Sequence, residues 1–397
     1  MRDPAPGRAG SLAFASLASP LSRCQAQSVI DRLQQRARSL TCQLDLLNSP
    51  QSEAQRAREA FVAASRVEVE FLLETLAAGR ARCLVLEAAD MFAADLGDAV
   101  IACVPDRGAP FDAFLNRGGH IMDEMEPRSS IGVMSQRVRA QLRHLWPDLR
   151  FEILRGGVDR AMEIHLRRSE IDGLVLPASV TEQLGIQGIV AEIFAPEFVL
   201  PGPGQGTLVV VARAGDDEVR ELLAPLHSED SARELAAESA FHARMLPDQD
   251  LPVGALARVD GPTVEIVGCT GTGRRHVTAT GAATDAATVG GELALRLLSH
   301  RDSLADLLEG DFPDGLPDEP DEDAELLGNL GDGEQEPQAT GVEGFDDLDD
   351  LGGYEDLGGY EDLAGDPDDD PDDPDDDDGD DDDPGILDDE GRGGRRR

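Results

Sequence analysis

The sequence predicts an α/β protein of two lobes, followed by a small α+β domain and a disordered acidic tail. Three observations support this. Strand-like and helix-like apolar patterns alternate over the first 200 residues, the Gly/Pro-rich segment 201–206 interrupts them, and the composition changes near residue 302. The 397 residues suffice for two or three domains of ordinary size.

Short apolar runs predict the core strands. Residues 83–86 and 100–104 are continuous apolar runs, which are typical of strands buried on both faces. The run 12–18 predicts a first core strand; the alternative, a signal peptide, is disfavoured because the run is short and contains serine. Further strands are expected at 151–154 and 173–176, and helices at 25–40, 68–78, 135–145 and 158–167. This alternation predicts largely parallel sheets.

The segment 201–206 is a candidate hinge, through which the chain leaves one lobe and re-enters the other with the strand 207–212. We therefore expect a first domain made of residues 10–105 and 207–224, and a second of residues 106–200. A third, residues 225–301, is expected to contain a helix over 228–245 capped by Ser228, strands at 253–258, 263–267 and 275–279, and a helix over 283–299.

The charge is concentrated at the C-terminal end. The net charge of the chain is −45, and residues 302–397 contribute −36 of it, with 40 acidic and 4 basic residues. Such a segment cannot bury enough apolar surface to offset its conformational entropy, so disorder is expected over 303–397. Residues 374–385 do not form an EF-hand calcium loop, because Pro374 and Gly385 stand at positions where such a loop has its calcium ligands. The negative field disfavours nucleic acid and anionic membranes as partners, and the partner of the tail stays unknown.

Deleting residues 310–397 is therefore expected to leave the melting temperature of the remaining protein nearly unchanged. Thermal unfolding of the full and shortened chains measures this. A large drop in melting temperature would show that the tail packs on the folded part.

Residue usage excludes several function classes. All 35 basic residues besides histidine are arginine, so Schiff-base catalysis by a lysine and Walker-type phosphate loops are excluded. The five cysteines form no CxxC pair, which argues against a zinc site or a disulfide framework, predicts no metal, and favours the cytoplasm. No run approaches the length of a membrane span.

A collinear series of motifs resembles the hydroxymethylbilane synthase (porphobilinogen deaminase) family. The series comprises Leu-Ala-Phe-Ala-Ser-Leu-Ala-Ser-Pro-Leu at 12–21, Leu-Arg-Gly at 154–156 and Leu-Pro-Gly-Pro-Gly-Gln-Gly at 200–206. The resemblance covers roughly residues 11–300. It implies two lobes similar to type II periplasmic binding proteins plus a third α+β domain. It also implies a monomer that condenses porphobilinogen into a linear tetrapyrrole on a dipyrromethane cofactor, which a cysteine thioether holds.

The resemblance also implies site residues. Asp90 matches the catalytic aspartate, whose carboxylate stabilises a cationic intermediate and handles protons. Because the growing chain is a polycarboxylate, the family binds it through arginine forks and polar groups. The matching positions are Ser19, Ser135, Arg137, Arg155 and Gln205.

The sequence departs from the family pattern at several positions that serve the same function, holding the cofactor and the growing chain. Gln249 stands where the family has its cofactor-bearing cysteine, and an amide cannot form the thioether. Ala89 replaces a lysine, and four arginine positions are occupied by Leu17, Val138, Ala161 and Gln183. Cys269 is expected to be a small buried residue.

Two functions remain open: a working synthase with an unusual anchor, or an inactive paralogue that binds porphobilinogen, a related small carboxylated ligand, or a protein. A glycine-rich nucleotide site at 202–206 or 268–273 is excluded, because neither segment has the required strand–loop–helix context.

Overall fold

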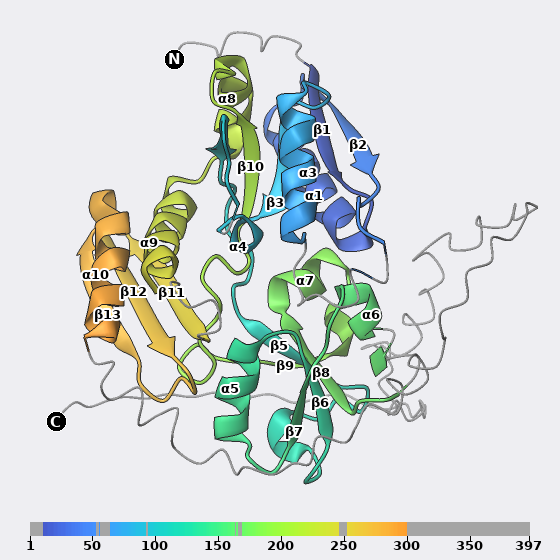
Figure 1. Ribbon diagram of the computed structural model, residues 1–397, viewed down its shortest axis with the longest axis vertical. Helices are drawn as coiled ribbons and strands as arrows, with labels where there is room; N and C mark the ends of the chain where they lie inside the picture. Colours follow the sequence, from blue (N-terminus) through green and yellow to red (C-terminus); the bar gives the residue numbers. More distant parts are fainter. Residues whose placement is uncertain are drawn as a thin grey trace, which may run out of the picture. The chain divides into compact units, whose positions relative to one another are not determined.

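A computed structural model describes residues 11–52, 55, 64–92, 94–162, 164–165, 169–245 and 252–299. This part of the chain forms three sheets with helices packed on them (Figure 1). The predicted acidic tail, 303–397, and most of the predicted cofactor loop, 246–251, lie outside the described residues.

The first sheet has the strand order β2-β1-β3-β10-β4. Its strands are β1 (Ser11–Leu17), β2 (Thr41–Leu47), β3 (Cys83–Glu87), β4 (Ala99–Cys103) and β10 (Leu208–Arg213). β1 runs parallel to β2 and β3, whereas β10 runs antiparallel to β3 and β4. The strand that follows the Gly/Pro segment therefore lies in the sheet of the N-terminal strands, while the domain boundaries stay a prediction.

The second sheet repeats this arrangement with the order β7-β6-β8-β5-β9. Its strands are β5 (Asp112–Leu115), β6 (Ser130–Val133), β7 (Arg150–Ile153), β8 (Gly173–Pro177) and β9 (Val190–Ile193). β6 is parallel to β7 and β8, and β5 is antiparallel to β8 and β9. Both sheets are thus mixed rather than largely parallel, because each receives one strand that runs against its neighbours.

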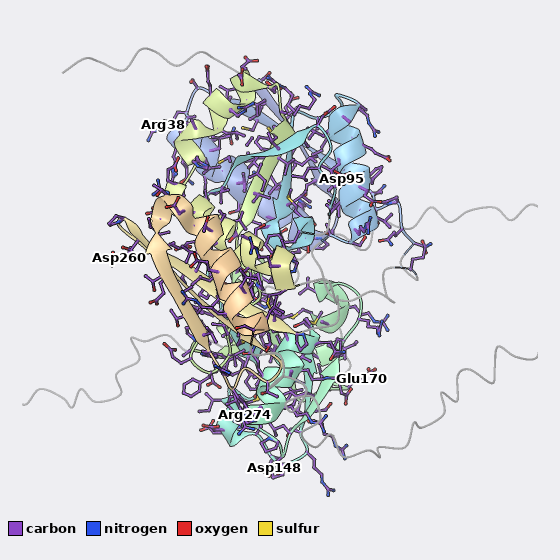
Figure 2. All side chains as sticks on the ribbon, turned by 60° about the vertical axis from the view of Figure 1, so that its left-hand side comes forward. Arg38, Asp95, Asp148, Glu170, Asp260 and Arg274 are labelled. Atoms are coloured by element: carbon purple, nitrogen blue, oxygen red, sulfur yellow. The ribbon has the colours of Figure 1, made fainter. Side chains whose placement is uncertain are left out.

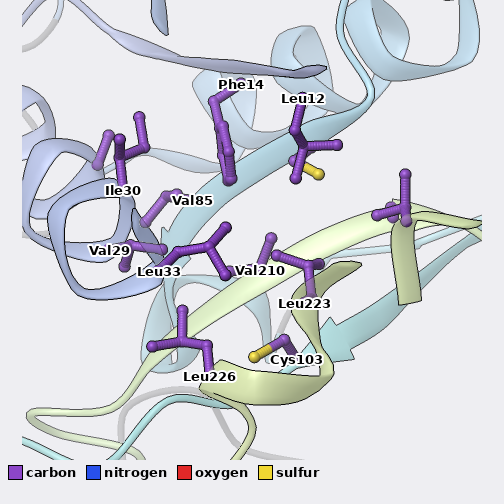
Figure 3. Close-up of a cluster of buried hydrophobic side chains, with 14 of the residues drawn as sticks. Leu12, Phe14, Val29, Ile30, Leu33, Val85, Cys103, Val210, Leu223 and Leu226 are labelled. Carbon is purple, nitrogen blue, oxygen red and sulfur yellow. The ribbon is translucent and has the colours of Figure 1, made fainter. Parts of the chain in front are cut away.

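Helices cover both faces of these sheets. In the first lobe, α1 (Pro20–Arg36) and α8 (Asp217–Leu223) pack on one face and α3 (Arg66–Ala77) on the other. Figure 3 shows the first of these cores, where Leu33 of α1 and Leu223 of α8 meet Val85 and Val210 of the sheet. In the second lobe, α5 (Gln136–Leu145) covers one face and α6 (Val158–Met162) with α7 (Ala178–Gln183) the other.

The third sheet is an antiparallel meander of β11 (Val253–Asp260), β12 (Thr263–Thr270) and β13 (Val277–Ala282). Asp260 and Arg274 mark its opposite ends (Figure 2). The helices α9 (Glu229–Met245) and α10 (Ala286–Leu298) pack on it and on each other. They approach so closely that a Cβ on Gly290 would lie 1.9 Å from the Ala237 carbonyl oxygen, so only glycine fits there.

The predicted strand at 83–86 is buried along its whole length, as expected. The prediction that 100–104 is buried on both faces is wrong, because β4 is an edge strand and Ile101 is 41% exposed. The predicted helices exist with shifted ends: α1 begins at Pro20 rather than residue 25, because Ser19 caps it and proline is suited to the first helical turn.

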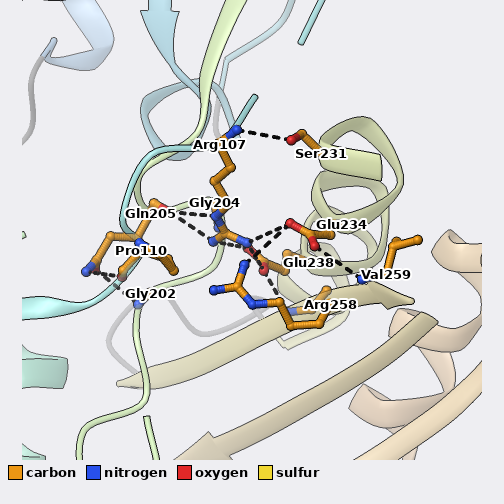
Figure 4. A network of polar contacts seen from close by, with 11 residues as sticks. Arg107, Pro110, Gly202, Gly204, Gln205, Ser231, Glu234, Glu238, Arg258 and Val259 are labelled. Carbon is orange, nitrogen blue, oxygen red and sulfur yellow. Dashed lines mark hydrogen bonds and ion pairs between the residues drawn. The ribbon is translucent and has the colours of Figure 1, made fainter. Parts of the chain in front are cut away.

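A buried ionic network fastens the third domain to the Gly/Pro segment (Figure 4). Arg107 donates to both carboxylate oxygens of Glu238 on α9, at 2.7 and 3.0 Å, and to the carbonyl oxygen of Gln205. Glu238 also accepts the backbone N–H groups of Gly204, at 2.6 Å, and Ala257, at 2.8 Å. One carboxylate thereby connects the Gly/Pro segment, β11 and an arginine ahead of β5.

Within the described ranges, no helix combines the length and the apolar content that a membrane crossing requires.

Candidate active site

Asp90 lies where the first sheet ends. The strand β3 leads directly into the short helix α4 (Ala88–Met91), and this places Asp90 at the carboxyl end of the strand. Its Oδ2 accepts the backbone N–H of Ala64 at 2.7 Å, and the side chain is half-buried. Asp90 lines a small recess that leaves almost no room even for a water molecule. We call this recess the Asp90 pocket; its walls comprise Ser16, Leu17, Ser22, Gln25, Ala64, Leu72, Val85, Leu86, Glu87 and Asp90.

Glu87 is a second carboxyl group in the same pocket, and sequence reasoning did not single it out. It ends an otherwise apolar strand and is only 8% exposed. Burial raises the pKa of Glu87 to about 7, since the charged form loses its hydration. The sequence could have indicated Glu87, because it is a charged residue that directly follows four apolar strand residues.

Both terminal nitrogens of the Arg137 guanidinium form hydrogen bonds inside the protein. Its guanidinium donates to both carboxylate oxygens of Asp112, at 2.8 and 3.0 Å, and also to the Leu200 carbonyl and the Gln205 side-chain oxygen. The amide of Gln205 in turn donates to the Pro110 carbonyl and to Asp112. These three side chains are buried, so Arg137 and Gln205 fix the Gly/Pro segment to β5 and α5.

The two predicted serine contacts are helix caps. The hydroxyl of Ser19 accepts the N–H of Ser22 at the start of α1, and that of Ser135 accepts the N–H of Val138 at the start of α5. Arg155 follows β7 and is exposed. The structure thus brings Arg137 and Gln205 together, and it places Ser19 beside Ser22, which lines the same recess as Asp90.

The four positions at which the resemblance would place arginines hold no positive charge. Leu17, Val138 and Ala161 are at most 3% exposed and belong to apolar cores. Gln183 on α7 accepts a hydrogen bond from the Gln25 amide on α1, at 3.1 Å, so neutral amides link the two lobes there. Ala89 is exposed at the start of α4.

The described residues supply little positive charge for the dipyrromethane that the resemblance implies. A polycarboxylate needs guanidinium forks, but the fork of Arg137 is occupied by Asp112, and three of the replaced positions lie in apolar cores. Gln249 lies outside the described residues. Cys269 on β12 is 1% exposed, as predicted, and burial raises the pKa of its thiol to about 11, so it is an inert buried thiol.

Metal-ligand groups are also missing from this part of the protein. No three His, Cys, Asp or Glu side chains of the described residues lie close enough together to hold an ion.

Titration of Glu87 is expected to make the protein less stable as the pH rises. The pKa of its carboxyl is about 7 when folded and about 4.3 when unfolded, so between these values only the folded state holds the proton. The free energy of unfolding should then fall across this window, by up to about 4 kcal/mol. His242 has the opposite effect, because burial lowers its pKa to about 4.

Comparing variants isolates the Glu87 contribution. Chemical denaturation of the protein and of Glu87→Gln between about pH 4.5 and about pH 8 should show the variant gaining relative stability as the pH rises. Glu265→Gln, at an exposed position on β12, serves as the control and should follow the unmodified protein. Parallel curves for the protein and Glu87→Gln would contradict the expectation.

Comparisons with known proteins give one consistent family. A family model described as porphobilinogen deaminase, dipyrromethane cofactor binding domain, matches residues 12–221. The porphobilinogen deaminase of Roseiflexus castenholzii is 37% identical over 235 residues, which are 58% of this chain and 76% of that protein. That of Roseiflexus sp. (strain RS-1) is 37% identical over 205 residues, or 52% and 66% of the two chains.

Solved structures resemble the chain more distantly. The methionine-binding protein MetQ has a TM-score of 0.36 at 13% identity and covers 58% of this chain and 94% of its own. A BvgS domain of Bordetella pertussis has a TM-score of 0.34 at 15% identity and covers 59% and 93%.

Proposed function

Because this chain belongs to the porphobilinogen deaminase family, we propose that it binds porphobilinogen or a related small ligand without polymerising it. The proposal rests on the contacts that Arg137 makes inside the protein. Its guanidinium, which the resemblance assigns to the substrate's carboxylates, is bound on both donor arms by Asp112 inside the protein.

The neighbouring positions support the same conclusion. Leu17, Val138 and Ala161 lie in packed cores, so the cations that would hold a growing polycarboxylate are replaced by apolar packing. Exchanging a charge for a buried aliphatic side chain is consistent with a site that no longer retains a long anionic chain. Gln249 in addition offers no thiol to a cofactor.

One observation favours the working synthase instead. Asp90, which the resemblance matches to the catalytic aspartate, lies half-buried at the carboxyl end of β3, a position suited to a catalytic carboxylate. Turnover of porphobilinogen by the purified protein, compared with Asp90→Ala, distinguishes the two functions. Our proposal expects no turnover in either protein. We still predict that the protein is a monomer in the cytoplasm and that it binds its ligand noncovalently.

A further inference from the structure

Basic side chains gather on the exposed side of α5 and on the loop that joins β12 to β13. This loop, residues 271–276, packs against α5, because a Cβ on Gly273 would lie 3.0 Å from Cγ of Gln141. Burial and the neighbouring Arg274 both lower the pKa of His144, so the loop approaches the last turn of the helix. We call this surface the arginine patch; it comprises Arg139, Arg143, His144, Arg274 and Arg275.

The positive charge of the patch is poorly balanced by nearby carboxylates. Neither α5 nor the loop contains an acidic residue, and Arg139, Arg274 and Arg275 form no ion pair with any described residue. Glu197, whose charge acts on His276, lies at the border of the patch. Of the net charge of −45, residues 302–397 hold −36, so the remainder of the chain carries −9 and is itself acidic. A cluster of unpaired arginines stands out on such a protein.

Stabilisation of α5 explains only part of the patch. Arg143 and His144 lie in the last turn of the helix, where cations interact favourably with the helix dipole. Arg274 and Arg275 add like charges beside that turn, and like charges repel one another unless an anion lies near them. The patch is therefore a surface that favours binding of an anionic group.

The described part of the third domain ends beside the arginine loop. Helix α10 follows β13 and packs along it. Arg296, in the last turn of α10, donates to the carbonyl oxygen of Thr278 at 3.0 Å, and Thr278 is the second residue of β13. Since β13 begins directly after the loop 271–276, α10 ends at the edge of the sheet that carries this loop. The chain continues from there, after Ser299, into its acidic part.

We propose that the arginine patch binds the aspartate-rich segment 366–383 of the same chain. This segment has 14 aspartates among its 18 residues, so its charge complements that of the patch. The spacer between Ser299 and the segment has about 65 residues, and a random coil of that length spans roughly 45 Å, enough to return to the patch. Because α5 belongs to the second lobe and the loop to the third domain, the bound segment connects the two.

Binding of this kind is weak and sensitive to salt. Exposed ion pairs contribute little to the free energy of unfolding, so the proposal agrees with the nearly unchanged melting temperature expected after deletion of residues 310–397. The Debye length falls from about 10 Å at 0.1 M salt to about 3 Å at 1 M, so high salt should release the segment.

Arginine modification by phenylglyoxal, followed residue by residue with mass spectrometry, tests the proposal on the full chain. At about 50 mM salt we expect Arg274 and Arg275 to react at least about fivefold more slowly than at about 1 M, because the bound segment covers them only at low salt. Arg23 and Arg38 are exposed and form no ion pair with the described residues, so they serve as internal controls whose rates should not change.

Substitutions show whether the patch is what holds the segment. Arg274→Gln combined with Arg275→Gln should remove the low-salt protection of Arg139, because the patch loses two of its charges. The matched pair Arg23→Gln and Arg38→Gln removes the same charge from a different surface and should leave Arg139 protected.

A deletion identifies the occupant. Without the aspartate-rich segment, Arg274 and Arg275 should react at low salt as fast as they do at high salt. Protection that persists after this deletion, equal rates at low and high salt in the full chain, or loss of protection in the control pair would overturn the inference. Protection that increases with protein concentration would also overturn it, since the segment would then come from a second copy of the chain.

Discussion

Purified protein incubated with porphobilinogen is expected to leave it unconverted and to carry no covalent pyrrole. The linear product requires an anchored primer, and Gln249 has no sulfur with which to hold one. Its carboxylates also require cations, which Leu17, Val138, Ala161 and Gln183 do not supply. At about 1.5–3 kcal/mol for each charged hydrogen bond, losing four forks lowers retention of the chain roughly ten-thousandfold or more.

Intact mass spectrometry and assay of hydroxymethylbilane measure these two expectations. A covalently held dipyrromethane would add a fixed increment to the polypeptide mass, and we expect the unmodified mass. Restoring a thiol with Gln249→Cys should not restore turnover, because the fork of Arg137 remains bound to Asp112. Robust product formation by the unmodified protein, lost in Asp90→Ala, would show that a noncovalent or relocated primer operates.

Much of the fold follows from the sequence because its core strands are strongly apolar. The continuous run at 83–86 forms the buried strand β3, and the run at 12–18 forms β1. The strand β2 was not predicted, since Asp45 and Gln43 interrupt its apolar pattern at the edge of the sheet. The strands β5 and β6 were not predicted either: Ser130 and Gly132 interrupt the apolar pattern of β6, and β5 begins at Asp112.

The candidate site residues came from the family resemblance, and the contacts of these residues could not be predicted from it. The resemblance pointed to Asp90, which the structure places at the carboxyl end of the apolar strand β3. Neither spacing nor resemblance could show that Asp112, 25 residues before Arg137, occupies its guanidinium. That pairing depends on how β5 and α5 meet in three dimensions, and a sequence pattern does not encode such distant partners.

Substituting Glu238 should destabilise the fold more than any surface change. Glu238 is fully buried, and it pairs with Arg107, whose side chain is 4% exposed. Glu238→Ala would leave that guanidinium without its bidentate partner and would leave the N–H groups of Gly204 and Ala257 without an acceptor. Breaking a buried pair costs roughly 3–5 kcal/mol, so we expect a loss of about that size.

Urea denaturation of Glu238→Ala measures the loss, and Glu229→Ala on the same helix is the matched control. Glu229 makes only exposed ion pairs, with Arg233 and His227, so its removal should change the free energy of unfolding by less than about 1 kcal/mol. Glu234, also on α9, is the nearest substitute: its Oε2 lies 3.7 Å from Arg107, while its Oε1 accepts the N–H of Val259, so it offers Arg107 one oxygen where Glu238 offers two. A loss below about 1 kcal/mol in Glu238→Ala would mean that water or Glu234 takes over the contacts, and that the hinge segment is held by Arg137 and Asp112 alone.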